Sequence, residues 1–306
     1  MKWKKLGRVF VPDGSIPWAK THAYVPTPIV MGNVIRVYAA FWDSDKVKRV
    51  GFVDVSAKDP TKVLNVSRTP ALDVGDIGTF DCDGVISSFA RSLVCGTIWL
   101  YYVGWQELAG PMRLLFAGLA ISADGGNRFY RYKQTPILER LDYERFIRST
   151  SFVWKEFDGV YNCWYTSSNG FIKIREHLVP SYTIQQAFSE DGIKWGKGRQ
   201  CLWFEGSEEF GLSRPWLLED GKIHKMFYSI RKIDKGYTLG YAESSDGGYT
   251  WERKDNEIGL EKSEEGWDSE MVCFPSIVDY EGKRYMFYNG NNYGETGFGV
   301  AVLEES

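Results

Sequence analysis

The stretch "FPSIVDYEGKRYMFYNG", residues 274–290, contains two apolar runs on either side of a Glu-Gly turn. Each run has the length and the β-branched or aromatic composition of a strand, so the stretch predicts two antiparallel strands. The same order of parts occurs at residues 215–230, "PWLLEDGKIHKMFYSI". A unit that recurs in this way predicts a repeat architecture.

The aromatic strand of this unit recurs along nearly the whole chain. A marker tyrosine stands in it at Tyr38, Tyr102, Tyr165, Tyr228 and Tyr288, so successive markers are separated by 64, 63, 63 and 60 residues. A further strand-like run follows each marker tyrosine. We therefore expect five similar units.

Three of the units continue into a Ser-x-Asp-Gly turn, at residues 122–125, 189–192 and 244–247. Asp followed by Gly favours a tight hairpin, because the Asp side chain accepts bonds from backbone donors and Gly adopts a positive φ. A fourth strand is expected after each turn. Four antiparallel strands per unit, repeated five times, predict an all-β fold of the five-bladed β-propeller type.

The two ends of the chain are expected to share the last unit. That unit stops at residues 299–306, "GVAVLEES", without a fourth strand. Residues 1–12, "MKWKKLGRVFVP", read as the missing strand, because Trp3 stands where other units have Trp195 and Trp251. The N-terminal strand would thus complete the last blade and close the ring, which removes exposed sheet edges.

Composition limits the functional classes. Lys+Arg 37 and Asp+Glu 40 give a formal net charge of −3, so no basic excess favours nucleic acid or an anionic membrane. The five cysteines are scattered and form no CxxC pair, which is typical of neither a disulfide framework nor a zinc site. Without a long apolar run or a signal-peptide pattern, we expect a cytoplasmic protein with a single domain over residues 1–306. The oligomeric state stays open.

Motifs for metals and cofactors are absent from the sequence. It has no HxxxH, no calcium loop, no GxGxxG between strand and helix and no phosphate-binding loop. A GxSxG motif for a serine nucleophile is also missing. We therefore expect no metal and no cofactor.

The residues that lead into the first strand of each unit are the candidate functional residues. In a propeller these strands line the central channel, so their leading residues open into a pocket at one end of it. The candidates are His22, Tyr24, Asp81, Asp83, Arg148, Thr150, Glu208, Arg214, Asp268 and Glu270. Trp105 and Asn291 follow aromatic strands and are expected at the rim of the pocket.

Four of these candidates are acids in matched places. Asp81 and Asp83 precede the second inner strand as Asp268 and Glu270 precede the fifth, and side chains at i and i+2 share a face. We expect them to converge on one axial pocket, where mutual repulsion raises at least one pKa. Paired carboxylates of this kind cleave glycosidic bonds, so Glu270 and Asp81 are the predicted acid and base, tuned by Asp268 and Asp83.

The cationic candidates Arg148 and Arg214, with His22, are expected to hold anionic or hydroxyl groups of a substrate. The same holds for Tyr24, Thr150, Glu208, Trp105 and Asn291 as further substrate-binding candidates. Structural alternatives remain open. Arg214 could belong to an ion pair, His22 could be a polar core residue, and Asp83, before a glycine, could cap a turn.

The pattern "P-S-I-V-x-x-x-G-K-x-Y-M-F-Y-N-G" and the Ser-x-Asp-Gly-x-x-Trp turns resemble the five-bladed propeller glycoside hydrolases over essentially the whole chain. That superfamily includes arabinanases, β-xylosidases, β-fructosidases and mannoside phosphorylases. The stretches "THAYVPTPIV" and "GTFDCDGV" are similar to an uncharacterised bacterial branch. The resemblance implies cleavage of a glycosidic bond in a small saccharide or sugar conjugate, whether neutral or anionic.

The chain departs from the pattern of these hydrolases at two places. Where the family has a catalytic Asp at the start of the first blade, this chain has His22 and Tyr24, and where it has an acid Glu in the third blade, this chain has Arg148. Two alternatives to hydrolysis therefore stay open. One is a glycoside phosphorylase that uses phosphate, and the other is a non-catalytic carbohydrate-binding propeller.

Overall fold

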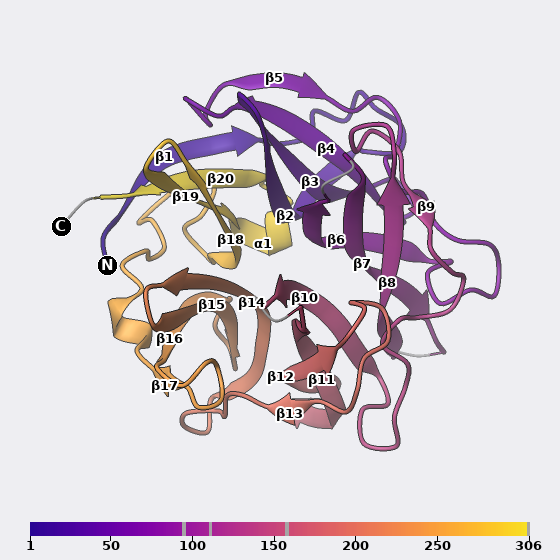
Figure 1. Ribbon diagram of the computed structural model, residues 1–306, viewed down its shortest axis with the longest axis vertical. Coiled ribbons are helices and arrows are strands. Elements are labelled where there is room, and N and C mark those ends of the chain that lie inside the picture. The colour runs from indigo at the N-terminus through magenta and orange to yellow at the C-terminus, as the bar shows by residue number, and fades with distance from the viewer. Residues whose placement is uncertain (94–95, 110–111, 157–158, 305–306) are drawn as a thin grey trace.

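The computed structural model describes residues 1–306 except 94–95, 110–111, 157–158 and 305–306, and its strands are arranged around a centre (Figure 1). Within the described residues, the only helical segments are a 3-10 turn, Asp255–Glu257, and a four-residue helix α1, Asn291–Gly294. The predicted all-β class is confirmed. No helix in this part of the chain has the length and apolarity needed to cross a membrane.

Antiparallel pairing gathers the described strands into groups that follow the predicted units. The first group is β2 (Thr21–Met31), β3 (Val34–Trp42), β4 (Lys48–Ser56) and β5 (Val63–Val66). The second is β6 (Gly84–Ser92), β7 (Ile98–Glu107), β8 (Arg113–Ser122) and β9 (Tyr130–Arg131). The third is β10 (Ile147–Lys155), β11 (Tyr161–Ile174), β12 (His177–Ser189) and β13 (Arg199–Gln200). The fourth is β14 (Glu209–Asp220), β15 (Ile223–Lys232), β16 (Thr238–Ser244) and β17 (Glu252–Arg253).

The last group contains both ends of the chain. It consists of β18 (Cys273–Tyr280), β19 (Lys283–Asn289), β20 (Phe298–Leu303) and β1 (Trp3–Phe10), in the order β1-β20-β19-β18. Trp3 pairs with Leu303, and Phe10 pairs with Phe298. The first strand, β1, and the last, β20, consequently lie side by side at one edge of the molecule (Figure 1). Between the first four groups the strand pairing consists of short parallel contacts, such as Lys48 with Gly84.

The marker tyrosines hold the groups together from within. All five are buried, and four of them donate their hydroxyl hydrogen to a carboxylate. The acceptors are Asp81 for Tyr102, Glu144 for Tyr165, Asp255 for Tyr228 and Asp268 for Tyr288, at 2.9, 2.9, 2.6 and 3.0 Å. Glycines on the neighbouring strand make room for two of these rings, because a Cβ on Gly118 or Gly240 would lie within 2.4 Å of Tyr102 or Tyr228.

The Ser-x-Asp-Gly turns join neighbouring groups. In the turn after β8, Ser122 Oγ accepts bonds from backbone N–H groups, including that of Gly126 at 2.9 Å. The carbonyl of Gly126 in turn accepts a hydrogen bond from Tyr38 of the first group, at 2.9 Å. Tyr101 of the second group likewise donates to Gly192 in the turn of the third group, at 3.0 Å. The predicted structural role of these turns therefore extends across the group boundary.

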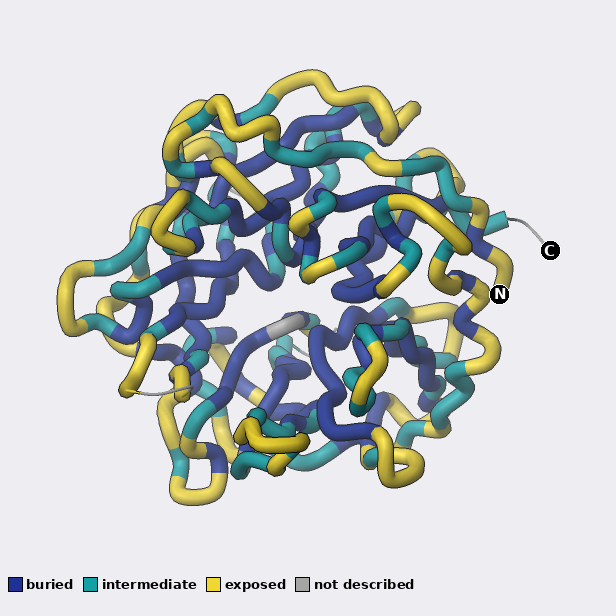
Figure 2. The backbone as a smooth tube through the Cα atoms, turned by 180° about the vertical axis from the view of Figure 1, so that it is seen from behind, coloured by how far each residue is buried: buried dark blue, intermediate teal, exposed yellow. Residues whose placement is uncertain are grey.

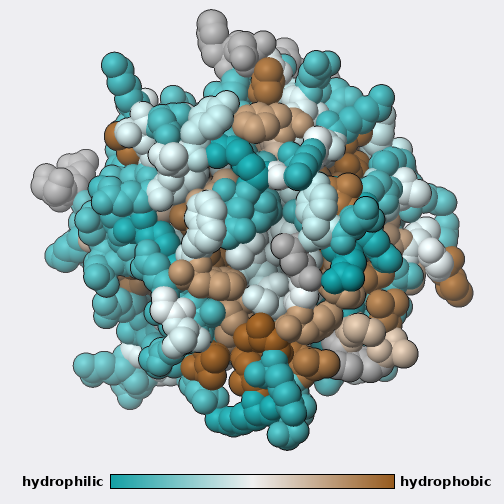
Figure 3. Space-filling model, turned by 90° about the horizontal axis from the view of Figure 1, so that it is seen from below, coloured by the Kyte–Doolittle hydropathy of each residue, from teal (hydrophilic) through white to brown (hydrophobic). Residues whose placement is uncertain are grey.

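Buried backbone lies along the inner strands, and exposed backbone is concentrated in the loops at the periphery (Figure 2). One face of the molecule carries mostly hydrophilic side chains, with hydrophobic ones gathered in limited areas (Figure 3). The four described cysteines, Cys82, Cys163, Cys201 and Cys273, are free.

Candidate functional site

Every innermost strand is irregular at the same place. The register of β2, β6, β10, β14 and β18 against the next strand shifts midway along each of them. In three of the strands the bulged residue precedes a proline and has a positive φ, namely Val25 (57°), Arg214 (55°) and Phe274 (57°). Bulges turn side chains away from the strict alternation of a strand, so these residues face a new direction.

The backbone N–H of each of these bulges is bound by the preceding group. The N–H of Val25 donates to Asn289 Oδ1 at 2.7 Å, and that of Phe274 donates to Ser229 Oγ at 2.8 Å. The N–H of Arg214 donates to Thr166 Oγ1 at 3.3 Å. Each acceptor comes directly after a marker tyrosine in the sequence, so one repeated dipeptide supports the bulges.

The bulges form the wall of a central pocket of about 540 Å³. All five inner strands contribute to its lining. From the bulged segments come Tyr24, Val25, Ser87, Ser88, Ser149, Thr150, Ser213, Arg214 and Phe274. The pocket is therefore the place where segments far apart in the sequence meet.

Aromatic rings, hydroxyl groups and guanidinium groups dominate the lining. Within the described part of the chain, none of the residues that line the pocket is Asp or Glu. Ser213 is buried, and its hydroxyl has no hydrogen-bond partner among the described residues. Such a site can accept an apolar ring face and hydrogen-bond several hydroxyl groups at the same time.

Arg214 is a predicted residue that is buried in this wall. The residue is 5% exposed and donates from Nη2 to Thr27 Oγ1 at 3.0 Å. Burial lowers the pKa of the guanidinium to about 9, so it stays charged at neutral pH. Three further predicted residues line the same pocket: Tyr24, Thr150 and Trp105. Lys48 and Arg113 lie over the Trp105 ring, 4.2 and 4.7 Å from its centre.

His22 lies beside the pocket lining rather than in it. Its ring stacks on Trp42 with the ring centres 3.8 Å apart, and Trp42 is a lining residue. Burial lowers the pKa of His22 to about 4, so the imidazole is neutral at pH 7. The ring therefore stiffens one wall as a neutral polar core residue, which was one of the two alternatives for it.

Asp81 and Asp268 have matching partners and do not line the central pocket. Asp81 is fully buried and accepts bonds from Tyr102, from Thr79 Oγ1 at 2.8 Å and from Arg131 Nε at 2.7 Å. Asp268 is buried as well, with Lys5 Nζ at 2.7 Å. In the second group the buried carboxylate thus joins the marker tyrosine to Arg131 of the outermost strand, β9. In the last group it joins the marker tyrosine to Lys5 of β1, which is the outermost strand there. These contacts do not agree with the prediction that the two acids converge on the pocket.

Asp83 and Glu270 are more accessible, although neither is among the residues that line the central pocket. Asp83 Oδ2 accepts a bond from the backbone N–H of Glu107 at 2.8 Å, and the N–H of Asp83 donates to the Trp105 carbonyl. Asp83 therefore binds a strand end, as in the alternative of a turn cap. The side chain of Asn291 accepts from the N–H of Glu270 at 2.7 Å, so Asn291 positions Glu270 from outside the lining.

Arg148 and Glu208 are occupied by local partners. Arg148 Nε lies 2.8 Å from Glu144 Oε2 in a buried ion pair, and Glu144 also accepts from Tyr165. Glu208 lies in an exposed pair with Lys235 at 2.9 Å. Neither residue lines the central pocket, and Arg148 pairs with an acid of its own group instead.

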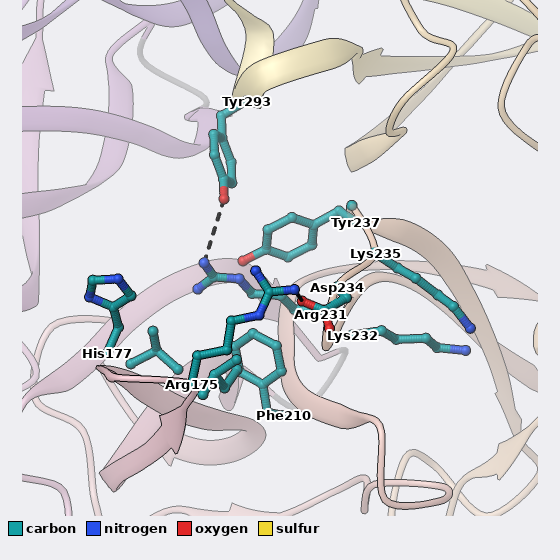
Figure 4. Close-up of a pocket in the computed structure, with 12 residues that line it drawn as sticks. Arg175, His177, Phe210, Arg231, Lys232, Asp234, Lys235, Tyr237 and Tyr293 are labelled. Carbon is teal, nitrogen blue, oxygen red and sulfur yellow. Dashed lines mark hydrogen bonds and ion pairs between the residues drawn. The ribbon is translucent and has the colours of Figure 1, made fainter.

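A second, smaller cavity of about 270 Å³ adjoins the central pocket (Figure 4). We call it the side pocket. It is lined by Ile174, Arg175, His177, Val179, Phe210, Arg231, Lys232, Asp234, Lys235, Gly236, Tyr237 and Tyr293. Because His177, Val179, Arg231, Tyr237 and Tyr293 line both cavities, the two are continuous.

Sequence reasoning missed most of the side pocket. Arg231, Tyr237 and Tyr293 come from β15, from the start of β16 and from α1, none of which leads into an inner strand. The missed bulge residues Val25 and Phe274 did carry a signal. Each precedes a proline inside an inner strand, as Arg214 does, and proline is found within sheets mainly at edges or bulges.

Within the described residues, no group of three or more His, Cys, Asp or Glu side chains is arranged to hold a metal ion. The side chains that line the two cavities are mainly donors and hydroxyls, which suit an oxygen-rich organic ligand better than a cation.

Comparison with known proteins places the chain among two sets of relatives. No family model matches it. The uncharacterized protein Rv1502 of Mycobacterium tuberculosis is 33% identical over 99% of this chain and 100% of its own length. A solved complex of BT0996 with RGII has a TM-score of 0.77 at 17% identity, covering 99% of this chain and 92% of the other.

A second solved structure belongs to the GH130 family, described as mannoside phosphorylases that include glycoside hydrolases for β-1,2 mannosidic linkages. Its TM-score is 0.74 at 14% identity, over 99% of this chain and 93% of that chain. At these identities the similarity concerns the fold. The chain has the fold of the propeller-type glycoside hydrolases, as the sequence resemblance predicted.

Proposed function

We propose that this chain, which belongs to the family of the uncharacterized Mycobacterium tuberculosis protein Rv1502, binds a saccharide in its central pocket. The observation that carries the proposal is the lining of that pocket. Aromatic rings and apolar side chains stand beside hydroxyl groups and Arg214, and the Ser213 hydroxyl is buried without a protein partner. A sugar offers the matching features, an apolar ring face and several hydroxyls that exchange hydrogen bonds.

The proposed architecture is a single-domain, five-bladed propeller closed by the N-terminal strand. The pairing of β1 with β20 supports it, as do the bonds of Asn289 in the last group to Val25 and Ala23 in the first. In such a ring the central pocket is formed at the hub. A cytoplasmic location stays a prediction from the sequence.

A screen of neutral and acidic mono- and oligosaccharides by thermal shift and calorimetry tests the binding. We expect at least one saccharide to bind to the wild type. Ser213→Phe should abolish that binding by filling the pocket, and Ser213→Ala should weaken it by about 3- to 10-fold through one lost hydrogen bond. Ser15→Ala, at an exposed serine outside the described pockets, is the matched control. Binding that survives Ser213→Phe unchanged would place the ligand elsewhere.

Cleavage of a glycosidic bond is the second candidate function. The position of Glu270 favours it, because this residue has an exposed carboxylate, its backbone N–H donates to Asn291, and its backbone lies against Gly236, which lines the side pocket. Glu270 would donate the proton to the leaving oxygen, and Asp83, the other accessible carboxylate among the predicted acids, would act as its partner.

Glu270→Gln separates this candidate from binding alone. The substitution keeps the shape of an exposed side chain, so we expect unchanged stability and loss of turnover with any glycoside that the wild type cleaves. Asp81→Asn is a poor probe of catalysis, because it disturbs a buried ion pair and should lower stability as well. Wild-type turnover in the Glu270→Gln variant would exclude Glu270 as the acid.

A further inference from the structure

Arg231 stands at the junction of the central pocket and the side pocket. Its guanidinium group points towards Tyr293 and lies beside the hydroxyl of Tyr237 (Figure 4). The Arg231 Nη2 to Tyr293 Oη distance is 3.5 Å, and the guanidinium lies 4.9 Å from the centre of the Phe210 ring. Aromatic rings and hydroxyls thus surround a half-buried positive charge.

No carboxylate forms a salt bridge with Arg231 among the residues that the structure describes. Each of the other charged residues of the side pocket has a partner of opposite charge. Arg175 pairs with Asp234 at 2.7 Å. The two lysines have acidic partners outside the pocket, Lys235 with Glu208 at 2.9 Å and Lys232 with Glu209 at 3.8 Å. Figure 4 shows both lysine side chains directed away from Arg231.

We propose that the side pocket binds an anionic group, a carboxylate or a phosphate monoester, that belongs to the saccharide held in the central pocket. This inference rests on the proposed function and narrows its ligand to acidic or phosphorylated saccharides. Arg231 is the anchor, because a planar guanidinium group binds such oxyanions through two parallel hydrogen bonds.

Because the two pockets share lining residues, a single ligand that occupies both of them is the simplest arrangement. Tyr237 and Tyr293 border both cavities and lie next to Arg231. The Tyr293 hydroxyl accepts a hydrogen bond from Arg231, so its own hydrogen can be donated to the same anion. The Tyr237 hydroxyl is hydrogen-bonded to that of Tyr182, and burial raises its pKa well above the usual value, so it stays protonated. His177, at the tip of the β11–β12 hairpin, lines the open side of the same junction.

Matched sets of sugars test the proposal. Glucose, glucuronate and glucose 6-phosphate are titrated into the full chain, as are galactose, galacturonate and galactose 6-phosphate. We expect the acidic member of at least one set to bind about 10- to 100-fold more tightly than the neutral member. Arg231→Gln should remove this difference by weakening the acidic sugar far more than the neutral sugar. Lys62→Gln, at an exposed lysine outside both pockets, should behave as the wild type.

Arg231→Lys and a change in ionic strength test the anion site even if Arg231→Gln has a folding defect. The lysine keeps the charge without the guanidinium fork, so part of the preference for the acidic sugar should remain. Raising the salt concentration should weaken the binding of the acidic sugar to the wild type, but not the binding of the neutral sugar. Melting temperatures of all variants are measured alongside.

The outcomes decide between the inference and its premise. Equal affinity for neutral and acidic sugars, or an equal loss of both in Arg231→Gln, overturns the anion site and leaves saccharide binding intact. Failure of every sugar to bind overturns both. Preference for the uronates identifies the anion as a carboxylate, and preference for the sugar phosphates identifies it as a phosphate.

Discussion

A buried carboxylate bound by a marker tyrosine is the residue-scale feature that recurs most often in this protein. Asp81 and Asp268 each combine such a tyrosine with a cation, Arg131 or Lys5. Removing one partner of a buried pair leaves the other charge uncompensated, so these acids are stabilising only as complete units. At this scale an acid in a repeated position indicates a structural anchor as readily as a catalytic group.

His22 leads to a prediction about pH at the same scale. An unfolded histidine has a pKa of about 6.5, whereas burial lowers that of folded His22 to about 4. Between these values only the unfolded chain takes up the proton, so the stability that neutral His22 contributes is lost as the pH falls from about 6.5 to about 4. The loss should amount to about 1–3 kcal/mol.

Urea unfolding at pH 7.5 and pH 4.5 measures this effect. Between these two pH values the free energy of unfolding should decrease less in His22→Gln than in the wild type, and the difference should equal the loss given above. His177→Gln, which changes an exposed histidine, should show the wild-type decrease. An identical pH dependence in wild type and His22→Gln would contradict the prediction.

At the scale of elements, bulges and turns have different structural roles. The bulges of the inner strands direct side chains such as Arg214 and Phe274 into the central pocket. The Ser-x-Asp-Gly turns, at the other end of the meander, present carbonyls to the neighbouring group. An inner strand therefore lines the central pocket at its irregular point, and a turn forms a contact between groups.

The turn at Asp246 gives a testable case. Hydrogen bonds from the Thr250 hydroxyl and from backbone N–H groups hold the pKa of Asp246 well below its usual range. The ionised form therefore stabilises the fold above about pH 4, and this contribution declines as the pH falls further. Asp246→Ala should lower the melting temperature by a few degrees at pH 7, and the difference should shrink at about pH 3.

Asp45→Ala, at an exposed aspartate in another loop, is the control for this turn and should melt with the wild type. Differential scanning calorimetry at both pH values is sufficient. A melting temperature of Asp246→Ala that matches the wild type at pH 7 would mean that the turn forms without the carboxylate.

For the whole molecule, the contact between the first and last groups is the critical one. Asn289, on β19, donates to the carbonyls of Ala23 and Gly297 and accepts from the N–H of Val25. It is fully buried, and its place after a marker tyrosine matches that of Thr166 and Ser229 in other groups. One side chain thus fixes both the boundary between the chain's ends and a bulge of the pocket wall.

Asn289→Ala should therefore destabilise the protein by about 2–4 kcal/mol, because buried backbone groups lose their partners. It should also weaken saccharide binding, since the Val25 bulge is no longer held. Asn256→Ala, at an exposed position, should change neither property. Chemical denaturation and the saccharide titration measure the two effects, and unchanged stability would show that the boundary does not depend on this side chain.

The sequence alone determined the strands, the turns, their period and the pairing of residues 1–12 with the end of the chain. These features follow from local patterns: alternating apolar and aromatic runs form strands, and Asp-Gly pairs form turns, wherever they occur. It also identified Tyr24, Thr150 and Arg214, which line the central pocket, because repeat equivalence marks the start of each inner strand, and Trp105, which follows an aromatic strand.

Only the tertiary structure decided which partner each of the remaining side chains meets. Asp81 and Asp268 stand in the same sequence context as a catalytic acid would, but Arg131 and Lys5 reach them from strands elsewhere in the sequence. Arg231 has no signal of its own, and its significance arises because no described carboxylate pairs with it at the junction of two cavities. Local chemistry sets where a strand runs, whereas the partner of a charge depends on residues that folding brings from far along the chain.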